Sequence, residues 1–206
     1  MLEANQSLGG VWSAERIYPD LKSNNIARRY EYPDFPIDEA KYGVKNGEHI
    51  PAAVIHQYLT DVADTTGVKS RLRFGWRVKT VKSLGADGWE VVADHAGRAH
   101  TIAATRLIMA TGVLNTTNMP QFKRQSDFQG SVFHSGDFSQ RRHTLKTARR
   151  AVFIGAAKSA YDLAWSYAQA GVAVDLLIRP TGNGPTWFAP AFVTPFRLSL
   201  ECLTST

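Results

Sequence analysis

The sequence contains a single cysteine, Cys202, among its 206 residues. One cysteine excludes an internal disulfide framework and metal clusters built from several cysteines. No segment approaches the roughly 20 consecutive apolar residues that span a bilayer, and no basic-then-apolar leader opens the chain. Repeats and low-complexity tracts are also missing. We therefore expect a globular protein with no metal site and no membrane partner, for which the cytoplasm is the default location.

Acidic residues are in the minority, since 24 Lys+Arg against 18 Asp+Glu give a formal net charge of +6. The basic residues concentrate in one segment, at Arg141, Arg142, Lys146, Arg149 and Arg150. One interpretation is a nucleic-acid interface, but neither interleaved aromatic residues nor a recognition motif supports it. We expect a solvated connector and no nucleic-acid partner. A mildly basic protein suits phosphate-bearing cofactors equally well.

The first half of the chain predicts a strand end, a long irregular stretch, a helix and a meander. Residues 1–5 resemble the last residues of a strand, and no regular pattern follows up to about residue 50. Apolar residues at helical spacing predict a helix over 51–66. Alternating segments at 72–82 and 89–93 flank an Asp-Gly turn signal, and a third short strand follows.

The second half predicts a parallel sheet. The apolar run 107–110 is typical of a strand buried on both faces, and the polar segment 113–148 is expected to be a connector. Beyond it, a strand over 151–154, a helix over 159–170 and a strand over 172–178 make one βαβ unit. This order of elements predicts the α/β fold class.

The turn after the 151–154 strand has the residue types of a dinucleotide-binding loop. Gly155 allows a tight strand-to-helix turn, while Ala157 and Ala160 are small enough for close approach of the pyrophosphate and for helix packing. Arg179 ends the next strand, where an arginine accepts the 2′-phosphate of NADP. Alanines replace the second and third glycines of the usual motif, so a close-packed turn with a surface arginine is the alternative.

A second motif lies in the connector and reads Phe128-x-Gly130-x-x-x-His134-x-x-x-Phe138. A histidine in such a connector is often a satisfied hydrogen-bonding residue, and the sequence alone does not make it catalytic. The motif and the order of elements resemble the two-dinucleotide-binding-domain flavoproteins, and within them the fungal-type flavin-containing monooxygenases. Related Baeyer–Villiger enzymes usually carry tryptophan at the last position, so Phe138 favours the flavin-containing or N-hydroxylating branch.

Further stretches resemble that family in the same order along the chain. They are Leu2-Glu3, Gly9-Gly10-Val11-Trp12, Tyr18-Pro19-x-Leu21-x-Ser23-Asn24, Ala110-Thr111-Gly112 and, less closely, Gly182-Asn183-Gly184-Pro185-Thr186-Trp187. The resemblance implies an FAD- and NADPH-dependent monooxygenase that inserts one oxygen of O2 into a small organic substrate through a peroxyflavin.

The resemblance also implies roles for single residues. The residues that it assigns to FAD are Glu3, Gly9, Gly10, Trp12, Thr111 and Gly112. Those that it assigns to NADPH are Gly155, Ala157, Lys158 and Ser159 at the pyrophosphate and Arg179 at the 2′-phosphate. Asn24 would hydrogen-bond near the reactive edge of the flavin. His134 would be catalytic or would order the connector.

The family pattern predicts three parts of unequal completeness. Residues 1–115 would be a partial FAD-binding domain that lacks the first strand and its glycine loop, which belong about 20 residues before Glu3. Residues 116–148 would be the connector, and 149–206 a partial NADP-binding domain. We therefore expect the 206 residues alone to bind FAD poorly or not at all. The alternatives are a non-catalytic truncated remnant and an NADP-dependent reductase without flavin.

Overall fold

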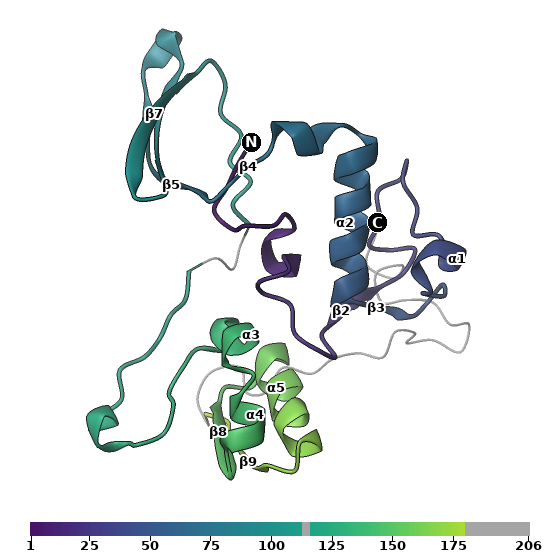
Figure 1. The fold of residues 1–206 in the computed structure, drawn as a ribbon, viewed down its shortest axis with the longest axis vertical. Helices are drawn as coiled ribbons and strands as arrows, with labels where there is room; N and C mark the ends of the chain where they lie inside the picture. The colour runs from purple at the N-terminus through teal and green to yellow at the C-terminus, as the bar shows by residue number, and fades with distance from the viewer. Residues whose placement is uncertain (113–115, 180–206) are drawn as a thin grey trace. The chain divides into compact units, whose positions relative to one another are not determined.

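The computed structural model describes residues 1–112 and 116–179, and these form two compact units along the ribbon of Figure 1. The first unit contains Met1–Ile17 and His56–Asn118, and the second contains Tyr18–Ile55 and Met119–Thr206. The units alternate along the chain, and each is described by itself. The domain boundaries expected from the sequence stay a prediction.

The described residues form helices and strands that are mostly short. The α-helices are α1 (Glu39–Tyr42), α2 (Ala52–Thr65), α3 (Phe138–Arg141), α4 (Thr144–Thr147) and α5 (Lys158–Gln169). The strands are β1 (Leu2–Glu3), β2 (Lys22–Ile26), β3 (His49–Pro51), β4 (Arg73–Phe74), β5 (Trp76–Ser83), β6 (Trp89–His95), β7 (Arg98–Ala104), β8 (Arg150–Ile154) and β9 (Ala173–Leu177). Short 3₁₀ helices include η1 (Gly10–Trp12) and η5 (Ser135–Asp137).

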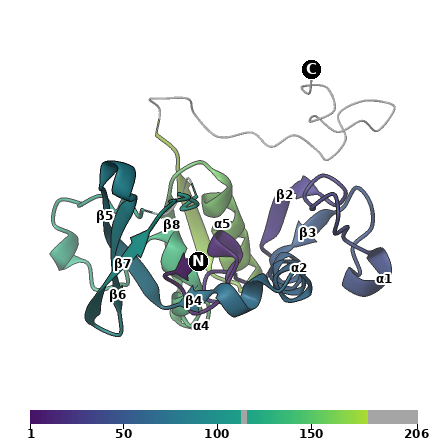
Figure 2. The ribbon, with the colours of Figure 1, turned by 90° about the horizontal axis from the view of Figure 1, so that it is seen from above.

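The first unit contains the predicted meander, in which β5, β6 and β7 pair antiparallel in sequence order (Figure 2). Its first turn ends at Gly88, whose φ of 95° and ψ of −130° only glycine adopts readily. The predicted strand end near the N-terminus is also confirmed, because β1 pairs in parallel with β4. Alternating sequence and turn residues were therefore sufficient to predict this part.

Helix α2 forms close to the predicted range. It begins directly after Pro51 and is followed by Gly67, whose φ of 70° lies in the left-handed region that favours glycine. Its buried residues include Ile55 and Tyr58, each 2% exposed. The apolar face inferred from the spacing is thus the face that the helix buries.

The βαβ unit of the second unit is confirmed. Strands β8 and β9 pair in parallel, in register from Arg150↔Ala173 to Ile154↔Leu177, and α5 packs against both strands (Figure 1). The inner side chains meet a buried cluster that comprises Phe138, Leu163, Tyr167 and Val172. Partly buried Tyr18, Phe133 and Phe153 surround it. This cluster joins the connector, the helix and the strands into one core.

The prediction for the apolar run 107–110 needs a correction, and the apolar strand β8 is less buried than its residues would allow. The run 107–110 forms no strand, and Ile108 is 89% and Met109 66% exposed. A buried parallel strand requires neighbours that satisfy its backbone groups, and within the described residues no strand pairs with this run. Strand β8 forms as predicted, but its inner residues Ala151 and Phe153 are only partly buried, and Val152 and Ile154 on its other face are more than half exposed.

The stretch before residue 50 is also more regular than expected. Strands β2 and β3 pair antiparallel around an irregularity in register, and α1 precedes β3. Asp38 caps α1, because its side chain accepts a hydrogen bond from the Lys41 N–H at 2.9 Å. Strands this short carry too little periodicity to be read from the sequence.

Candidate functional site

The glycine-containing loop lies between the end of β8 and the start of α5. Gly155 has φ of 145°, and its N–H donates to the Leu177 carbonyl at 3.1 Å, which fixes the turn to the neighbouring strand. A Cβ built at Gly155 would lie 3.8 Å from the Ala160 Cβ, which is ordinary contact. The backbone angle, rather than lack of space, is therefore what favours glycine here.

The start of α5 has the features of an anion site. Ala157 occupies the N-cap position and has no side-chain oxygen to accept from the first-turn N–H groups. Its carbonyl accepts from the N–H groups of Ala160 and Tyr161. The N–H groups of Lys158 and Ser159 belong to the first turn, where a helix offers donors to a phosphate. The residues present thus fit the pyrophosphate of a dinucleotide.

A cluster of polar side chains stands one turn into α5. The Tyr18 hydroxyl donates to Asp162 Oδ2 at 3.1 Å, and the Lys158 ammonium donates to the same oxygen. Burial raises the pKa of the Tyr18 hydroxyl, and the negative charge of Asp162 raises it further. Tyr18 is therefore a neutral donor at physiological pH.

Tyr18 and Asp162 were not among the predicted site residues. The spacing of Lys158 and Asp162, four residues apart on a helix, was visible in the sequence as a salt-bridge pair. Tyr18 carried no such signal, since 144 residues separate it from Asp162.

The connector motif has a structural explanation at each fixed position. A Cβ at Gly130 would lie 2.6 Å from the Phe128 ring, so the ring occupies the space that glycine leaves. His134 Nδ1 accepts from the Gly136 N–H at 3.0 Å and caps η5. Phe138 is 1% exposed in the core cluster. The recorded contact of the His134 ring is thus a local cap on the turn that begins η5.

Asn24 lies in β2 where the register with β3 shifts. Lys22 pairs with Pro51 and Ile26 with His49, so the residues between form a bulge. The buried Ser23 hydroxyl accepts from the Ile50 N–H at 3.0 Å and replaces a backbone partner. Asn24 is exposed at this bulge. Bulges are common beside active sites because they direct a side chain out of the regular pattern.

The residues expected to contact FAD, apart from Asn24, belong to the first unit. Glu3 ends β1, and its Oε1 accepts from the Asn5 N–H at 2.8 Å. Gly9 has φ of 111°, and a Cβ there would lie 3.1 Å from the Trp12 carbonyl group, so the tight turn requires glycine. Thr111 and Gly112 are exposed on irregular backbone.

The structure therefore divides the predicted residues between the two units. The first unit holds Glu3, Gly9, Gly10, Trp12, Thr111 and Gly112, and the second holds Asn24, His134, Gly155, Ala157, Lys158, Ser159 and Arg179. Arg179 is exposed just beyond β9. The Gly182–Trp187 stretch and Cys202 lie outside the described residues.

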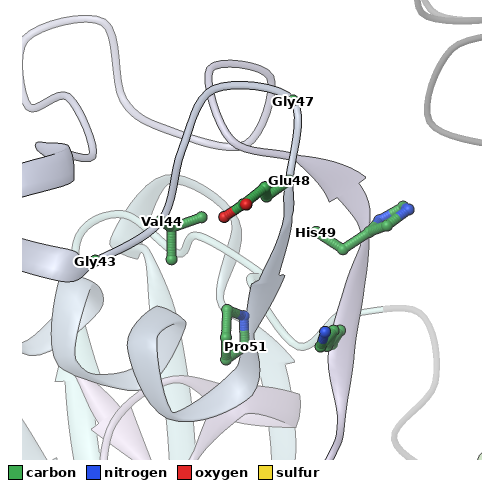
Figure 3. A pocket seen from close by; sticks show the side chains of 7 residues that line it. Gly43, Val44, Gly47, Glu48, His49 and Pro51 are labelled. Carbon is green, nitrogen blue, oxygen red and sulfur yellow. The ribbon is translucent and has the colours of Figure 1, made fainter.

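A pocket of about 380 Å³ lies elsewhere in the second unit, beside β2 and β3 (Figure 3). Its lining comprises Lys22, Gly43, Val44, Gly47, Glu48, His49 and Pro51, none of which is a predicted site residue. Figure 3 shows the side chains of Val44 and Glu48 close together, while that of His49 points away from them. The Glu48 carboxylate accepts a hydrogen bond from the Lys45 N–H at 3.0 Å, and this bond stabilises the turn between the two residues.

Metal and membrane features were searched for in residues 1–112 and 116–179. These ranges hold no group of three or more His, Cys, Asp or Glu side chains that could bind a metal ion. No helix within them is long and apolar enough to cross a bilayer.

Comparison with known proteins places the chain in a family. The model of the family described as "Pyridine nucleotide-disulphide oxidoreductase" matches residues 22–191. An FAD-dependent monooxygenase of Pyrenophora dematioidea is 32% identical over 202 residues, which cover 92% of this chain and 36% of that protein. The chain thus spans little more than a third of that relative's length.

Two solved structures show the same fold. Tmm from Pelagibacter sp. strain HTCC7211 matches with a TM-score of 0.74 at 21% identity, over 92% of this chain and 46% of that one. OTEMO in complex with FAD and NADP matches with a TM-score of 0.64 at 22% identity, over 85% and 33%. These likenesses confirm the α/β fold class. Because the family model covers most of its length, the chain belongs to the pyridine nucleotide-disulphide oxidoreductase family, and its resemblance to fungal flavin-dependent monooxygenases is confirmed.

Proposed function

We propose that the chain is part of an FAD- and NADPH-dependent monooxygenase that inserts one oxygen atom of O2 into a small organic substrate. The loop from Gly155 to Ser159 carries this proposal, because it presents the first-turn N–H groups of α5 at the end of a parallel strand. The family also includes disulphide oxidoreductases, but a single cysteine provides no dithiol pair within these 206 residues. The FAD-dependent relative favours oxygen chemistry instead.

The chain's own residues would bind and orient the cofactors. First-turn N–H groups and the Lys158 ammonium would hold the dinucleotide pyrophosphate, and Arg179 would bind the 2′-phosphate. In the first unit, Glu3 would accept hydrogen bonds from the ribose of FAD, beside the Gly9-Gly10 turn. The flavin supplies the redox chemistry when bound.

Asn24 and His134 have different roles in this proposal. The exposed Asn24 amide at the β2 bulge would donate a hydrogen bond near the reactive edge of the flavin. His134 would act as a positioning residue, because its Nδ1 is engaged by the Gly136 N–H. The expected consequence is that His134→Ala impairs the order of the connector rather than a proton transfer.

Isothermal titration of the purified chain with NADP⁺ and with NAD⁺ tests the proposal. We expect tighter binding of NADP⁺, and we expect Arg179→Ala to weaken it roughly 10- to 150-fold, since a hydrogen-bonded charge contributes about 1.5–3 kcal/mol. The affinity of Arg179→Ala for NAD⁺, which lacks the 2′-phosphate, should equal that of the wild-type chain. Arg141→Ala, which removes an exposed arginine of the connector, is the matched control. Equal affinity of the wild-type chain for the two dinucleotides would contradict the assignment of Arg179.

The flavin dependence needs a separate measurement. NADPH oxidation is followed at one protein concentration, with and without added FAD, on protein that carries the flanking regions of the longer relatives. The proposal expects NADPH consumption to require FAD and O2. Oxidation at the same rate without FAD would favour the flavin-independent reductase.

A further inference from the structure

We propose that Tyr18 and Asp162 are positioning residues that set how much of the Lys158 charge is available to a dinucleotide phosphate at the start of α5. The inference rests on the proposed function, since it deepens the description of the same loop. It gives a role to two residues, Tyr18 and Asp162, to which neither the family resemblance nor the comparisons assign one.

The geometry places three groups on one carboxylate oxygen. Asp162 Oδ2 accepts from the Tyr18 hydroxyl at 3.1 Å and also from the Lys158 ammonium. The side chains of Lys158 and Asp162 are 28% and 25% exposed, so water screens the pair only partly. Lys158 is the first residue of α5 and so lies at the end of the helix that attracts anions, while its ammonium is bound to Asp162 one turn further on.

Asp162 and a bound phosphate would compete for the same ammonium. In the structure, the carboxylate is stabilised by two donors, and one of them, Lys158, would be drawn toward the phosphate. When a partly buried carboxylate loses its charged partner, the cost of having removed its charge from water is no longer offset. The Tyr18 hydroxyl reduces this cost, because it remains a hydrogen-bond donor to Asp162 when Lys158 turns to the ligand.

Tyr18 is held in place for this role. Its ring packs edge-on against Phe138, with ring centroids 5.4 Å apart and an interplanar angle of 74°. Burial and the charge of Asp162 raise the pKa of its hydroxyl, so the hydroxyl stays protonated and can only stabilise the carboxylate by donating. The packing of the Tyr18 ring on Phe138 therefore holds the Tyr18 hydroxyl beside Asp162 of α5.

The arrangement also links two sequence motifs of the second unit. Tyr18 begins the segment that leads into β2 and Asn24, and Phe138 is the last residue of the connector motif. Both are in contact with α5 or its core cluster. Occupancy of the dinucleotide loop is therefore expected to change the hydrogen bonding of the residue that opens the Asn24 segment.

The test is isothermal titration of NADP⁺ and of inorganic pyrophosphate into the wild-type chain, Tyr18→Phe, Asp162→Asn and the double variant. Tyr18→Phe keeps the ring on Phe138 and removes only the hydroxyl. The hydroxyl donates to Asp162 both before and after Lys158 turns to the ligand, so only the strengthening of this bond on binding changes the affinity. We therefore expect the variant to weaken binding of both ligands about three- to tenfold, which is less than the full effect of one hydrogen bond to a charged group. In the Asp162→Asn background the competing charge is gone, and we expect Tyr18→Phe to have no effect.

Tyr167→Phe is the matched control. Tyr167 lies on the same helix, is 3% exposed, and its hydroxyl is hydrogen-bonded to Thr144 rather than to Asp162. We expect this variant to lose stability but to keep its ligand affinity, which separates a general loosening of α5 from the proposed role. Circular dichroism of each variant checks that the fold is retained.

Three outcomes would overturn the inference. They are an unchanged affinity in Tyr18→Phe, an equal loss in the Asp162→Asn background, and an equal loss in Tyr167→Phe. A wild-type chain that binds pyrophosphate but not NADP⁺ would instead contradict the proposed function. The inference would then be decided by the pyrophosphate affinities of the wild-type chain and the variants. A wild-type chain that binds neither ligand would overturn both.

Discussion

The meander of β5, β6 and β7 and the βαβ unit of β8, α5 and β9 are held together by different interactions. In the meander, backbone pairing links all three strands, with one register shift between Val78 and Thr80, and the buried side chains of those strands are Val91 and Ala93. In the βαβ unit, side chains from the helix and the connector reach a cluster of nearly inaccessible aromatic and aliphatic residues. One region depends on its turns, and the other depends on its core.

This difference predicts which changes each region tolerates. A meander built from neighbouring strands should be sensitive to the backbone conformation of its turns and tolerant of changes on its exposed faces. A helix that buries one face should be sensitive to the volume of the residues beneath it. Three measurements, taken from the largest expected effect to the smallest, can break or sharpen this contrast.

The largest effect is expected for Phe138→Ala. Phe138 is 1% exposed and contacts Tyr18 and Tyr167 through its ring, so truncation leaves a cavity in the core of the second unit. We expect a loss of about 3–5 kcal/mol in the free energy of unfolding. Denaturant unfolding, with hydrogen exchange to locate the change, measures it.

Phe128→Ala is the control, because Phe128 belongs to the same motif but is 61% exposed. Its expected loss is less than about 1 kcal/mol. Faster exchange should appear in α5, β8 and β9 and not in the meander. Equal losses in the two variants, or faster exchange in the meander as well, would show that the regions do not differ as described.

A smaller effect is expected for Gly88→Ala in the first turn of the meander. A Cβ at Gly88 would lie 2.4 Å from the Ala104 carbonyl oxygen, which is backbone and cannot turn aside, and φ is 95°. We expect a cost of about 2–3 kcal/mol, visible as faster amide exchange along β5, β6 and β7.

Gly97→Ala separates the two causes of that cost. Gly97 also has a left-handed φ, of 76°, but nothing lies within 4 Å of a Cβ built there. Its expected cost is about 1–2 kcal/mol, from the backbone angle alone. If Gly88→Ala is no more damaging than Gly97→Ala, the close approach of the Ala104 carbonyl does not contribute.

The same contrast explains how much of the fold the sequence predicts. Both regions were predicted because their sequence patterns are local. The meander shows alternating apolar and polar residues around a glycine turn. The βαβ unit shows an apolar strand, a turn of small residues and a helix in succession. The run 107–110 has an equally clear apolar pattern but forms no strand, since the pattern does not supply a pairing partner. The exposed outer face of β8 has the same cause, because apolar residues are buried only where another element covers them.

The candidate site also contains residues that the local sequence predicts and contacts that it does not predict. Gly155, Ala157, Lys158 and Ser159 follow one another closely after β8, and Arg179 follows β9, so the local βαβ pattern together with the family resemblance was enough to name them. The Tyr18 contact with Asp162 depends on tertiary packing between distant segments, and no periodicity signals it. The structural roles of Gly130 and His134 were hidden for a different reason, because the motif shows which residues are fixed but not what each one contacts.

The smallest effect is expected from an ion pair on the surface of the βαβ unit. The Arg150 guanidinium donates two hydrogen bonds to Asp175 across β8 and β9, and these bonds lower the pKa of the Asp175 carboxyl below its usual value of 3.8. The folded state thus favours the ionised carboxylate. Its contribution is fully present above about pH 3.8 and is lost as the pH falls through the lowered pKa of the folded state.

We expect Asp175→Asn to reduce the urea midpoint only slightly at pH 7, because both side chains of the pair are well exposed to water, and we expect this difference to shrink as the pH is lowered below 3.8. Urea titrations of the wild-type chain and the variant across this pH range measure the difference. A difference that grows toward low pH would contradict the sign of the pKa shift. A difference at pH 7 as large as that of Phe138→Ala would mean that the surface pair, rather than the buried cluster, holds β8 and β9 together, and the contrast between a turn-dependent and a core-dependent region would fail.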